Sequence, residues 1–332
     1  MKKIDAPEVR WGILGAGDVC EVKSAPAMKK IENSKLVAVM RRNGDKARAY
    51  AERHDVPKWY ASADELINDP EVNAVYIATP PHAHAELTKR VAAAGKPVYV
   101  EKPMARTYAE CLNMNKTCDK AGVPLYVAYY RRALPNFLKI KELIENGTIG
   151  DVRLIQIQMY KPVGFNTTVS PEDNWRVDPE IAGGGYFSDL ASHQLDFLDF
   201  IFGPIVGVNG FSANQAGLYK AKDIVTGNFR FENGVLGSGT WCFTCDNSSE
   251  LDRTTIIGSK GDIIYPTFGK AYVAVKTEGN KSEHYDFEMP EHIQQPLIEL
   301  VVDDLLGRAE CPSTGVSGAR TNLVMERMVG SV

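Results

Sequence analysis

Hydrophobic and polar residues follow a regular alternation from residue 9 to about residue 129. Short apolar runs, rich in β-branched residues, alternate with longer stretches in which apolar residues recur at helical spacing. The apolar runs are VRWGIL, LVAVM, NAVYIAT, PVYVE and PLYVAY. Such runs have no polar face, which is typical of strands buried on both sides of a sheet. The alternation predicts an α/β domain built on a doubly wound parallel sheet, a Rossmann fold.

Two of the helical stretches have clear ends. HAHAELTKRVAAAG and TYAECLNMNKTCDKAG finish at Gly95 and Gly122. Glycine often closes a helix because it adopts left-handed dihedral angles without steric cost. We expect both stretches to be helices that connect neighbouring parallel strands.

The pattern changes after about residue 130. A helical stretch, NFLKIKELIENGTIG, leads into longer strand-like runs separated by Gly, Asn and Asp turns: VRLIQIQMY, IVTGNFRF, VLGSGTWCF and RTTIIGS. The remaining helical patterns are GGGYFSDLASHQLDFLDFIFG, HIQQPLIELVVDDLLG and GARTNLVMERMVG. These patterns predict a second, α+β domain with a large, mostly antiparallel open sheet. We place the two domains at residues 1–129 and 130–332.

Composition and charge narrow the class of protein. Hydrophobic residues make up 44% of the 332 residues and charged residues 24%, as in soluble globular proteins. No apolar run approaches the roughly 18 to 20 residues that span a bilayer, and charged residues and a proline interrupt the start of the chain. The net charge is -4 and the basic residues are scattered. We expect a cytoplasmic protein with no membrane partner and no nucleic-acid partner.

Cysteines and histidines offer little support for a metal site. Six cysteines spread over a long chain are typical of reduced thiols in a cytosolic protein. Cys242 and Cys245 form a C-x-x-C pattern, but it has no second pair and lies in strand-like sequence, so we interpret both as structural. His82 and His84 are alternate residues at a helix start and point in different directions. We therefore predict no metal.

A glycine-containing loop follows the first predicted strand. GILGAGDVC lies between a strand and a helix, which is the context of a dinucleotide-binding fingerprint. The first glycine allows a tight turn, and the second leaves room for a pyrophosphate at the helix start. Cys20 stands in place of the third glycine, and an ordinary strand-turn-helix remains the alternative. The candidate cofactor contacts in this loop are Gly15, Ala16, Gly17, Asp18 and Val19.

The end of the second predicted strand indicates which cofactor is bound. An NAD enzyme would usually carry an acidic residue there for the ribose hydroxyls, but this chain reads VAVMRRNGD. The guanidinium groups of Arg41 and Arg42 suit a 2′-phosphate. The pattern favours NADP(H) over NAD(H), and the alternative is that these arginines are solvated loop residues.

Five motifs in order resemble the glucose-fructose oxidoreductase / inositol dehydrogenase / MocA family. They are GILGAG, VYIATPPHAH, VYVEKPMA, IENGTIGDVR and GGGYFSDLASHQLDFLDFIFG, and the resemblance extends from about residue 9 to the end. It implies an NAD(P)-dependent oxidoreductase acting on a sugar, a polyol or a related hydroxylated carbonyl compound. Relatives form dimers or tetramers, so the resemblance also implies a homodimer or homotetramer.

The same resemblance assigns the catalytic residues. It places Lys102 at the carboxyl end of a Rossmann strand, beside the nicotinamide, where an ammonium can stabilise charge on a substrate oxygen. Asp189 and His193 are four residues apart, hence on one helix face. An imidazole can exchange a proton with that oxygen near neutral pH, while Asp189 would orient the imidazole or bind substrate. A structural salt bridge for Lys102 and a structural Asp–His pair are the alternatives.

Further cofactor contacts follow by analogy with the family. They are Thr79, Pro80, His84, Glu101 and Lys102, together with Trp175 and Arg176, whose stretch NWR is similar to that of 1,5-anhydro-D-fructose reductases. The chain departs from the family at Tyr130, where many members have asparagine. Members that retain the dinucleotide and act as glycosidases or lyases, and members that are non-enzymatic NADP-binding sensors, remain alternatives.

Overall fold

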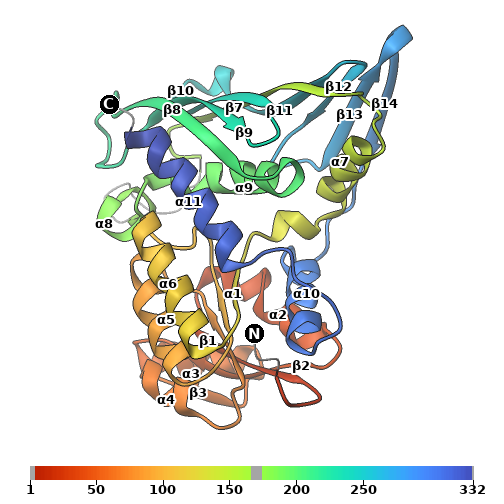
Figure 1. Ribbon diagram of the computed structural model, residues 1–332. Helices are drawn as coiled ribbons and strands as arrows, with labels where there is room; N and C mark the ends of the chain where they lie inside the picture. Colours follow the sequence, from red (N-terminus) through yellow and green to blue (C-terminus); the bar gives the residue numbers. More distant parts are fainter. Residues whose placement is uncertain (1–3, 166–173, 331–332) are drawn as a thin grey trace. The chain divides into compact units, whose positions relative to one another are not determined.

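The computed structural model describes residues 4–165 and 174–330 and forms two compact units (Figure 1). The first unit is Met1–Tyr130 with Pro290–Ala319, and the second is Arg131–Met289 with Arg320–Val332. The sequence pattern predicted one boundary near residue 130, with all later residues in the second domain. Tertiary packing instead places residues 290–319 in the first unit: the Ser313 hydroxyl donates to the Val127 carbonyl oxygen at 2.7 Å.

A six-stranded parallel sheet forms the centre of the first unit. Its strand order is β3-β2-β1-β4-β5-β6, which confirms the predicted doubly wound sheet. The strands are β1 (Val9–Leu14), β2 (Ser34–Met40), β3 (Lys58–Tyr60), β4 (Ala74–Ile77), β5 (Val98–Val100) and β6 (Leu125–Val127). Strand β3 was not predicted, because it has only three residues and is partly exposed, so it leaves no apolar run.

Helices cover both faces of this sheet. They are α1 (Asp18–Val22), α2 (Ala25–Lys30), α3 (Gly44–Arg53), α4 (Ala63–Asn68), η1 (Pro81–Ala83), α5 (His84–Ala93), α6 (Tyr108–Ala121), α10 (Gln295–Leu305) and the first residues of α11 (Gly315–Gly330). Helices α5 and α6 pack together, whereas α2 packs against α10 (Figure 1). Gly122 ends α6 in the left-handed conformation, as its position predicted.

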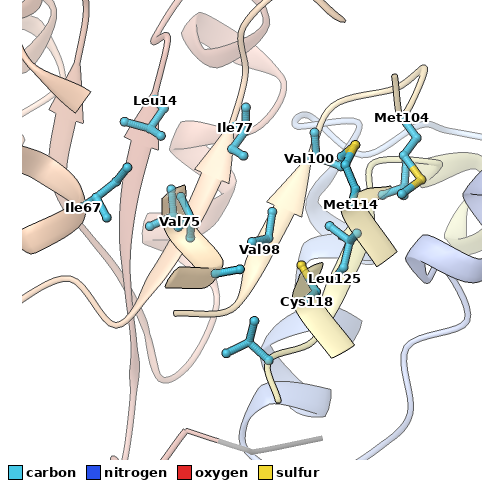
Figure 2. Packing of buried hydrophobic residues seen from close by; sticks show 14 of the residues in the cluster. Leu14, Ile67, Val75, Ile77, Val98, Val100, Met104, Met114, Cys118 and Leu125 are labelled. Atoms are coloured by element: carbon cyan, nitrogen blue, oxygen red, sulfur yellow. The ribbon is translucent and has the colours of Figure 1, made fainter. Parts of the chain in front are cut away.

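The apolar contact between the sheet and α6 is shown in Figure 2. Val98 and Val100 of β5 are fully buried, and Met114 and Cys118 of α6 belong to the same cluster. Burying a side chain of this size stabilises a fold by about 1.5–3 kcal/mol relative to leaving it exposed. The central strands are therefore a fixed base for the loops at their ends.

The second unit contains an eight-stranded sheet. The order is β14-β13-β12-β11-β7-β10-β9-β8, and all neighbours are antiparallel except β7 and β10. This confirms the predicted, mostly antiparallel sheet. The strands are β7 (Val152–Pro162), β8 (Ile205–Ala213), β9 (Ile224–Phe231), β10 (Leu236–Cys245), β11 (Leu251–Gly258), β12 (Gly261–Tyr265), β13 (Tyr272–Thr277) and β14 (Lys281–Asp286).

Helix α9 packs on one face of this sheet, against β9 and β10. The helices of the second unit are η2 (Tyr130–Ala133, whose first residue belongs to the first unit), α7 (Pro135–Glu145), η3 (Trp175–Val177), α8 (Pro179–Ala182), α9 (Gly185–Phe202), η4 (Asn247–Ser249), η5 (Glu278–Asn280) and the later part of α11. Phe137 of α7, Phe197 of α9 and Tyr265 of β12 meet edge to face. In the described part of the chain, no helix has both the length and the apolar content needed to cross a membrane.

A buried ion pair anchors α9. The Arg132 guanidinium donates to both carboxylate oxygens of Asp196, at 2.8 and 2.7 Å. The next acidic residue, Asp199, accepts two hydrogen bonds from Arg320, at 2.9 and 2.6 Å. Burial raises the pKa of Asp196 to about 6, although Arg132 opposes that shift. These pairs fix the second half of α9.

We predict that Asp196→Ala lowers the free energy of unfolding by about 3–5 kcal/mol, because it leaves the Arg132 charge buried without its main partner. The double variant Arg132→Met with Asp196→Leu removes both charges and should cost much less. Urea unfolding followed by circular dichroism measures both. Equal losses in the single and double variants would contradict the role of the unpaired charge.

Candidate functional site

The carboxyl ends of five strands in the first unit lie in register. Leu14 pairs with Met40 on one side and with Ile77 on the other, Ile77 pairs with Val100, and Val100 pairs with Val127. Hydrogen bonds continue one residue past this row. The backbone amides of Gly15, Ala78, Glu101 and Ala128 donate, respectively, to the carbonyl oxygens of Met40, Leu14, Ile77 and Val100. The residues two places beyond the row are Ala16, Arg42, Thr79, Lys102 and Tyr129. The predicted cofactor residues of this unit thus follow the carboxyl ends of adjacent strands, where ligands bind in open α/β sheets.

Gly15 is required by the turn after β1. Its φ is +84°, and a Cβ added there would lie 2.6 Å from the Thr79 methyl carbon and 3.1 Å from the Thr79 amide nitrogen. Gly17, the N-cap residue of α1, is different: the nearest atom to its added Cβ is the Gly15 oxygen at 3.7 Å. Packing within the protein therefore explains why residue 15 is glycine. It does not explain why residue 17 is glycine.

Cys20 fills the position of the third glycine in the fingerprint. It is fully buried, and its carbonyl oxygen accepts a hydrogen bond from the Tyr50 hydroxyl at 2.7 Å. Burial, with a smaller effect of the nearby Glu101 carboxylate, raises the pKa of the Cys20 thiol to about 12. The side chain is a neutral packing group.

Arg41 and Arg42 follow β2. The Arg41 amide continues the ladder by donating to the Tyr60 carbonyl oxygen of β3 at 3.2 Å. Arg41 is partly exposed and Arg42 is exposed. Both residues follow the second strand, as the sequence predicted, and the register of β1 with β2 places them at the same sheet edge as Gly15.

Glu101 carries a buried carboxylate at the end of β5. Only 7% of the residue is exposed. One carboxylate oxygen accepts hydrogen bonds from the Tyr76 hydroxyl at 2.5 Å and the Gln294 amide at 2.7 Å, and the other accepts from the Lys102 backbone amide at 3.1 Å. Burial, reinforced by this carboxylate, raises the pKa of Tyr76 well above its usual value. Glu101, expected as a cofactor contact, therefore holds the backbone of Lys102, whose peptide bond to Pro103 is cis.

His84, also expected as a cofactor contact, is fully buried. One ring nitrogen lies 2.7 Å from the Thr79 carbonyl oxygen and the other 3.1 Å from the Met104 carbonyl oxygen. Burial lowers the pKa of the imidazole. Its ring joins the loops that follow β4 and β5, the loops that contain Thr79 and Lys102. Pro80 precedes η1 in the first of them.

In the second unit, three of the predicted residues lie together. The Arg176 guanidinium carbon is 4.6 Å from the centre of the Trp175 ring, and its Nε is 3.7 Å from an Asp189 carboxylate oxygen. The Asn174 side chain orders this stretch by accepting from the Arg176 amide at 3.1 Å and donating to the Tyr186 hydroxyl at 2.8 Å. The stretch NWR is thus attached to the start of α9.

His193 lies one turn after Asp189 on α9. It is 2% exposed, and its ring meets the Phe268 ring edge to face at 5.8 Å. The helix begins at Gly185, whose φ is +65° and whose added Cβ would lie 2.4 Å from the Ala221 Cβ. Gly185 therefore allows Ala221 to approach the start of α9 closely, and the ion pairs of Asp196 and Asp199 hold its second half.

Two residues of the site escaped sequence reasoning. Gln294 contacts Glu101 across 193 positions, and Arg132 contacts Asp196 across 64. Neither belongs to a spaced motif. Arg132 lies two residues after Tyr130, where the sequence departs from the family, but nothing in the sequence shows that Asp196 is buried and needs a cation.

Comparison with known proteins identifies relatives of the whole chain. Residues 9–129 match the oxidoreductase-family model of an NAD-binding Rossmann fold, and residues 137–264 match the GFO/IDH/MocA C-terminal domain. Oxidoreductase P35 of Formosa agariphila is 41% identical over 323 residues, which cover 97% of this chain and 99% of that protein. Myo-inositol 2-dehydrogenase of Thermotoga maritima is 30% identical over 302 residues, 88% and 85% of the two chains.

A solved structure gives the same fold. Levoglucosan dehydrogenase in complex with NADH and levoglucosan matches with a TM-score of 0.86 at 22% identity, over 98% of this chain and 97% of that chain. The matches to the two family models and the sequence identity over nearly the full length agree with the resemblance found in the motifs. The parallel sheet of the first unit and the mostly antiparallel sheet of the second agree with it as well. The chain belongs to the GFO/IDH/MocA family of oxidoreductases, with a nicotinamide-dinucleotide-binding Rossmann domain.

Proposed function

We propose that the protein is an NADP(H)-dependent dehydrogenase or reductase of a sugar, a polyol or a related hydroxylated carbonyl compound. The observation that carries the proposal is the row of loops at the carboxyl edge of the parallel sheet. Gly15 and Thr79 adjoin there, and the Glu101 carboxylate holds the backbone of Lys102 at the end of β5. This edge suits a bound dinucleotide, and it offers the Lys102 ammonium as the cation that would contact the substrate oxygen.

The proposed cofactor preference rests on charge. Arg41 and Arg42 follow β2, at the position where an acidic residue would bind the ribose hydroxyls of NAD. Guanidinium groups attract a phosphate and can donate two parallel hydrogen bonds to it. No atom lies closer than 3.7 Å to a Cβ added at Gly17, so internal packing does not require this glycine, whereas the approach of a pyrophosphate of either cofactor would.

The substrate class is supported by relatives. Myo-inositol 2-dehydrogenase and levoglucosan dehydrogenase are named for ring compounds that carry several hydroxyl groups. Among the substrate classes proposed, we therefore place cyclic polyols and sugars first. We also propose a homodimer or homotetramer, which light scattering on the purified protein distinguishes.

The proposed mechanism divides the work between two side chains. A nicotinamide dinucleotide held at the loop of Gly15 and Gly17 would supply the hydride chemistry. The Lys102 ammonium hydrogen-bonds the substrate oxygen and stabilises the negative charge that develops on it during transfer. His193 gives that oxygen a proton during reduction and takes the hydroxyl proton during oxidation. Asp189, whose carboxylate lies 3.7 Å from the Arg176 Nε, orients the imidazole or binds substrate.

A turnover screen tests the reaction class. Purified protein is assayed with NADP and NADPH in both directions against aldoses, ketoses, inositols, anhydro-sugars and aromatic dihydrodiols. Turnover on one chemical group supports a dehydrogenase or reductase. No turnover on any of them, with the dinucleotide still tightly bound, would contradict the proposal in favour of a glycosidase, a lyase or a sensor that retains its cofactor.

We predict that Lys102→Met or His193→Ala lowers kcat by about 10²–10⁴-fold, because each removes a group that acts on the substrate oxygen. The dissociation constant for NADPH should change little. Lys96→Met is the matched control, because Lys96 precedes the same strand and donates to the Asp69 carbonyl oxygen at 2.8 Å. Wild-type turnover in both Lys102→Met and His193→Ala would exclude this mechanism.

Cofactor discrimination gives a separate prediction. Arg41→Asp should weaken NADPH binding by roughly 10- to 100-fold and NADH binding far less, because it places a carboxylate where the phosphate would lie. Fluorescence titration measures both constants. Arg308→Asp is the control, since Arg308 follows α10 and pairs with Asp303. Equal losses for both cofactors in Arg41→Asp would count against the phosphate role.

A further inference from the structure

We propose that Gln294 is a positioning residue for catalysis: its amide holds the Glu101 carboxylate, and Glu101 in turn holds the backbone of Lys102. The inference rests on the proposed catalytic role of Lys102. Gln294 lies in the segment that follows the second unit's sheet in sequence and packs into the first unit. No motif of the chain assigns it a role.

The hydrogen bonds form one continuous path. The Gln294 side-chain nitrogen donates to a Glu101 oxygen at 2.7 Å, and the second Glu101 oxygen accepts from the Lys102 amide at 3.1 Å. Gln294 is 1% exposed, so water does not substitute readily for its amide. Without the Gln294 amide, the Glu101 carboxylate keeps its hydrogen bonds from the Tyr76 hydroxyl and the Lys102 amide and loses the third.

The surroundings of Gln294 set the direction of its amide. The Tyr99 hydroxyl donates to the Gln294 side-chain oxygen at 3.3 Å, so the amide nitrogen faces Glu101. The opposite orientation would place an oxygen against the carboxylate, which accepts hydrogen bonds and donates none. Gln294 is thus matched to a negatively charged neighbour.

The backbone of the same segment holds the cofactor-loop helix. The Gln294 amide donates to the Lys23 carbonyl oxygen at 3.2 Å, and a His292 ring nitrogen lies 2.7 Å from the Val22 carbonyl oxygen. Val22 and Lys23 close α1, the helix that the Gly15 loop opens. One short segment therefore supports both the cofactor loop and the Lys102 loop.

Removal of the amide is the first test. We expect Gln294→Met, which keeps length and removes the donor, to lower kcat by roughly 10- to 100-fold, because a small displacement of a catalytic group is costly. KM and NADPH affinity should change much less. Ser313→Ala is the matched control: it removes a buried hydrogen bond of the same segment, to Val127, and leaves Glu101 untouched. Its turnover should be close to wild type.

The pH dependence of turnover in Gln294→Glu distinguishes a positioning role from a purely structural one. At low pH the introduced carboxyl group keeps its proton and donates to Glu101 as the amide does. As pH rises, the two carboxyl groups cannot both ionise without repulsion. Turnover relative to wild type should therefore be high at low pH and fall as pH rises.

The titratable groups near Gln294 do not account for a pH-dependent ratio of variant to wild-type turnover. Burial raises the pKa of Cys20 to about 12 and those of Tyr76 and Tyr99 well above their usual value, and it lowers the pKa of His84. His292 is on the same segment. All of these groups are present in the wild type, so the ratio of the variant to the wild type isolates the introduced carboxyl group.

The outcomes separate this inference from the proposed function. Loss of kcat in Gln294→Met with the pH-dependent ratio in Gln294→Glu supports it. Wild-type turnover with unchanged kcat in Gln294→Met, or a ratio for Gln294→Glu that does not vary with pH, overturns the inference alone. An equal loss in Ser313→Ala also overturns it, because packing of the segment would then suffice. A wild-type protein that turns over no substrate removes the proposed function first, and the inference with it.

Discussion

Parallel strands can exchange backbone hydrogen bonds only in matched register, and in the first unit this constraint determines where the residues of the proposed cofactor site lie. Met40, Leu14, Ile77, Val100 and Val127 form one row across five strands. Since all strands run in the same direction, the loops that follow them leave the sheet at the same edge. The glycine turn, the paired arginines and Lys102 belong to different helical crossovers, and register alone brings them to one edge.

Hydrogen bonds to two buried carboxylates, those of Glu101 and Asp196, stabilise the segments that contain Lys102 and His193. A carboxylate removed from water must find donors, because it cannot donate. Glu101 finds them on β4, on its own loop and on the segment that contains Gln294. Asp196 finds them on Arg132. In both cases the residue that satisfies the charge also holds the backbone near a residue proposed to act on substrate: Lys102 in the first unit and His193 in the second.

Much of the fold was predictable because its elements are apolar and local in sequence. The runs at β1 and β9 have the same bounds in the sequence and in the structure. Gly122 ends α6 by a property of glycine that needs no tertiary contact. The half-exposed β3 left no such pattern and was missed. For the site, strand ends were enough to place Gly15 and Lys102 at a common edge, and their roles in catalysis and binding are the part that we propose.

The sequence by itself determined that the first sheet is parallel, that the second is mostly antiparallel and that Asp189 and His193 share one helix, because periodicity and caps act within a few residues. Only the tertiary structure decided that the two ring nitrogens of His84 lie beside backbone carbonyl oxygens, that residues 290–319 join the first unit and that Gln294 meets Glu101. The last contact joins residues 193 positions apart. A single hydrogen bond over such a separation leaves no repeat in the chain, so it becomes visible only when packing has brought the partners together.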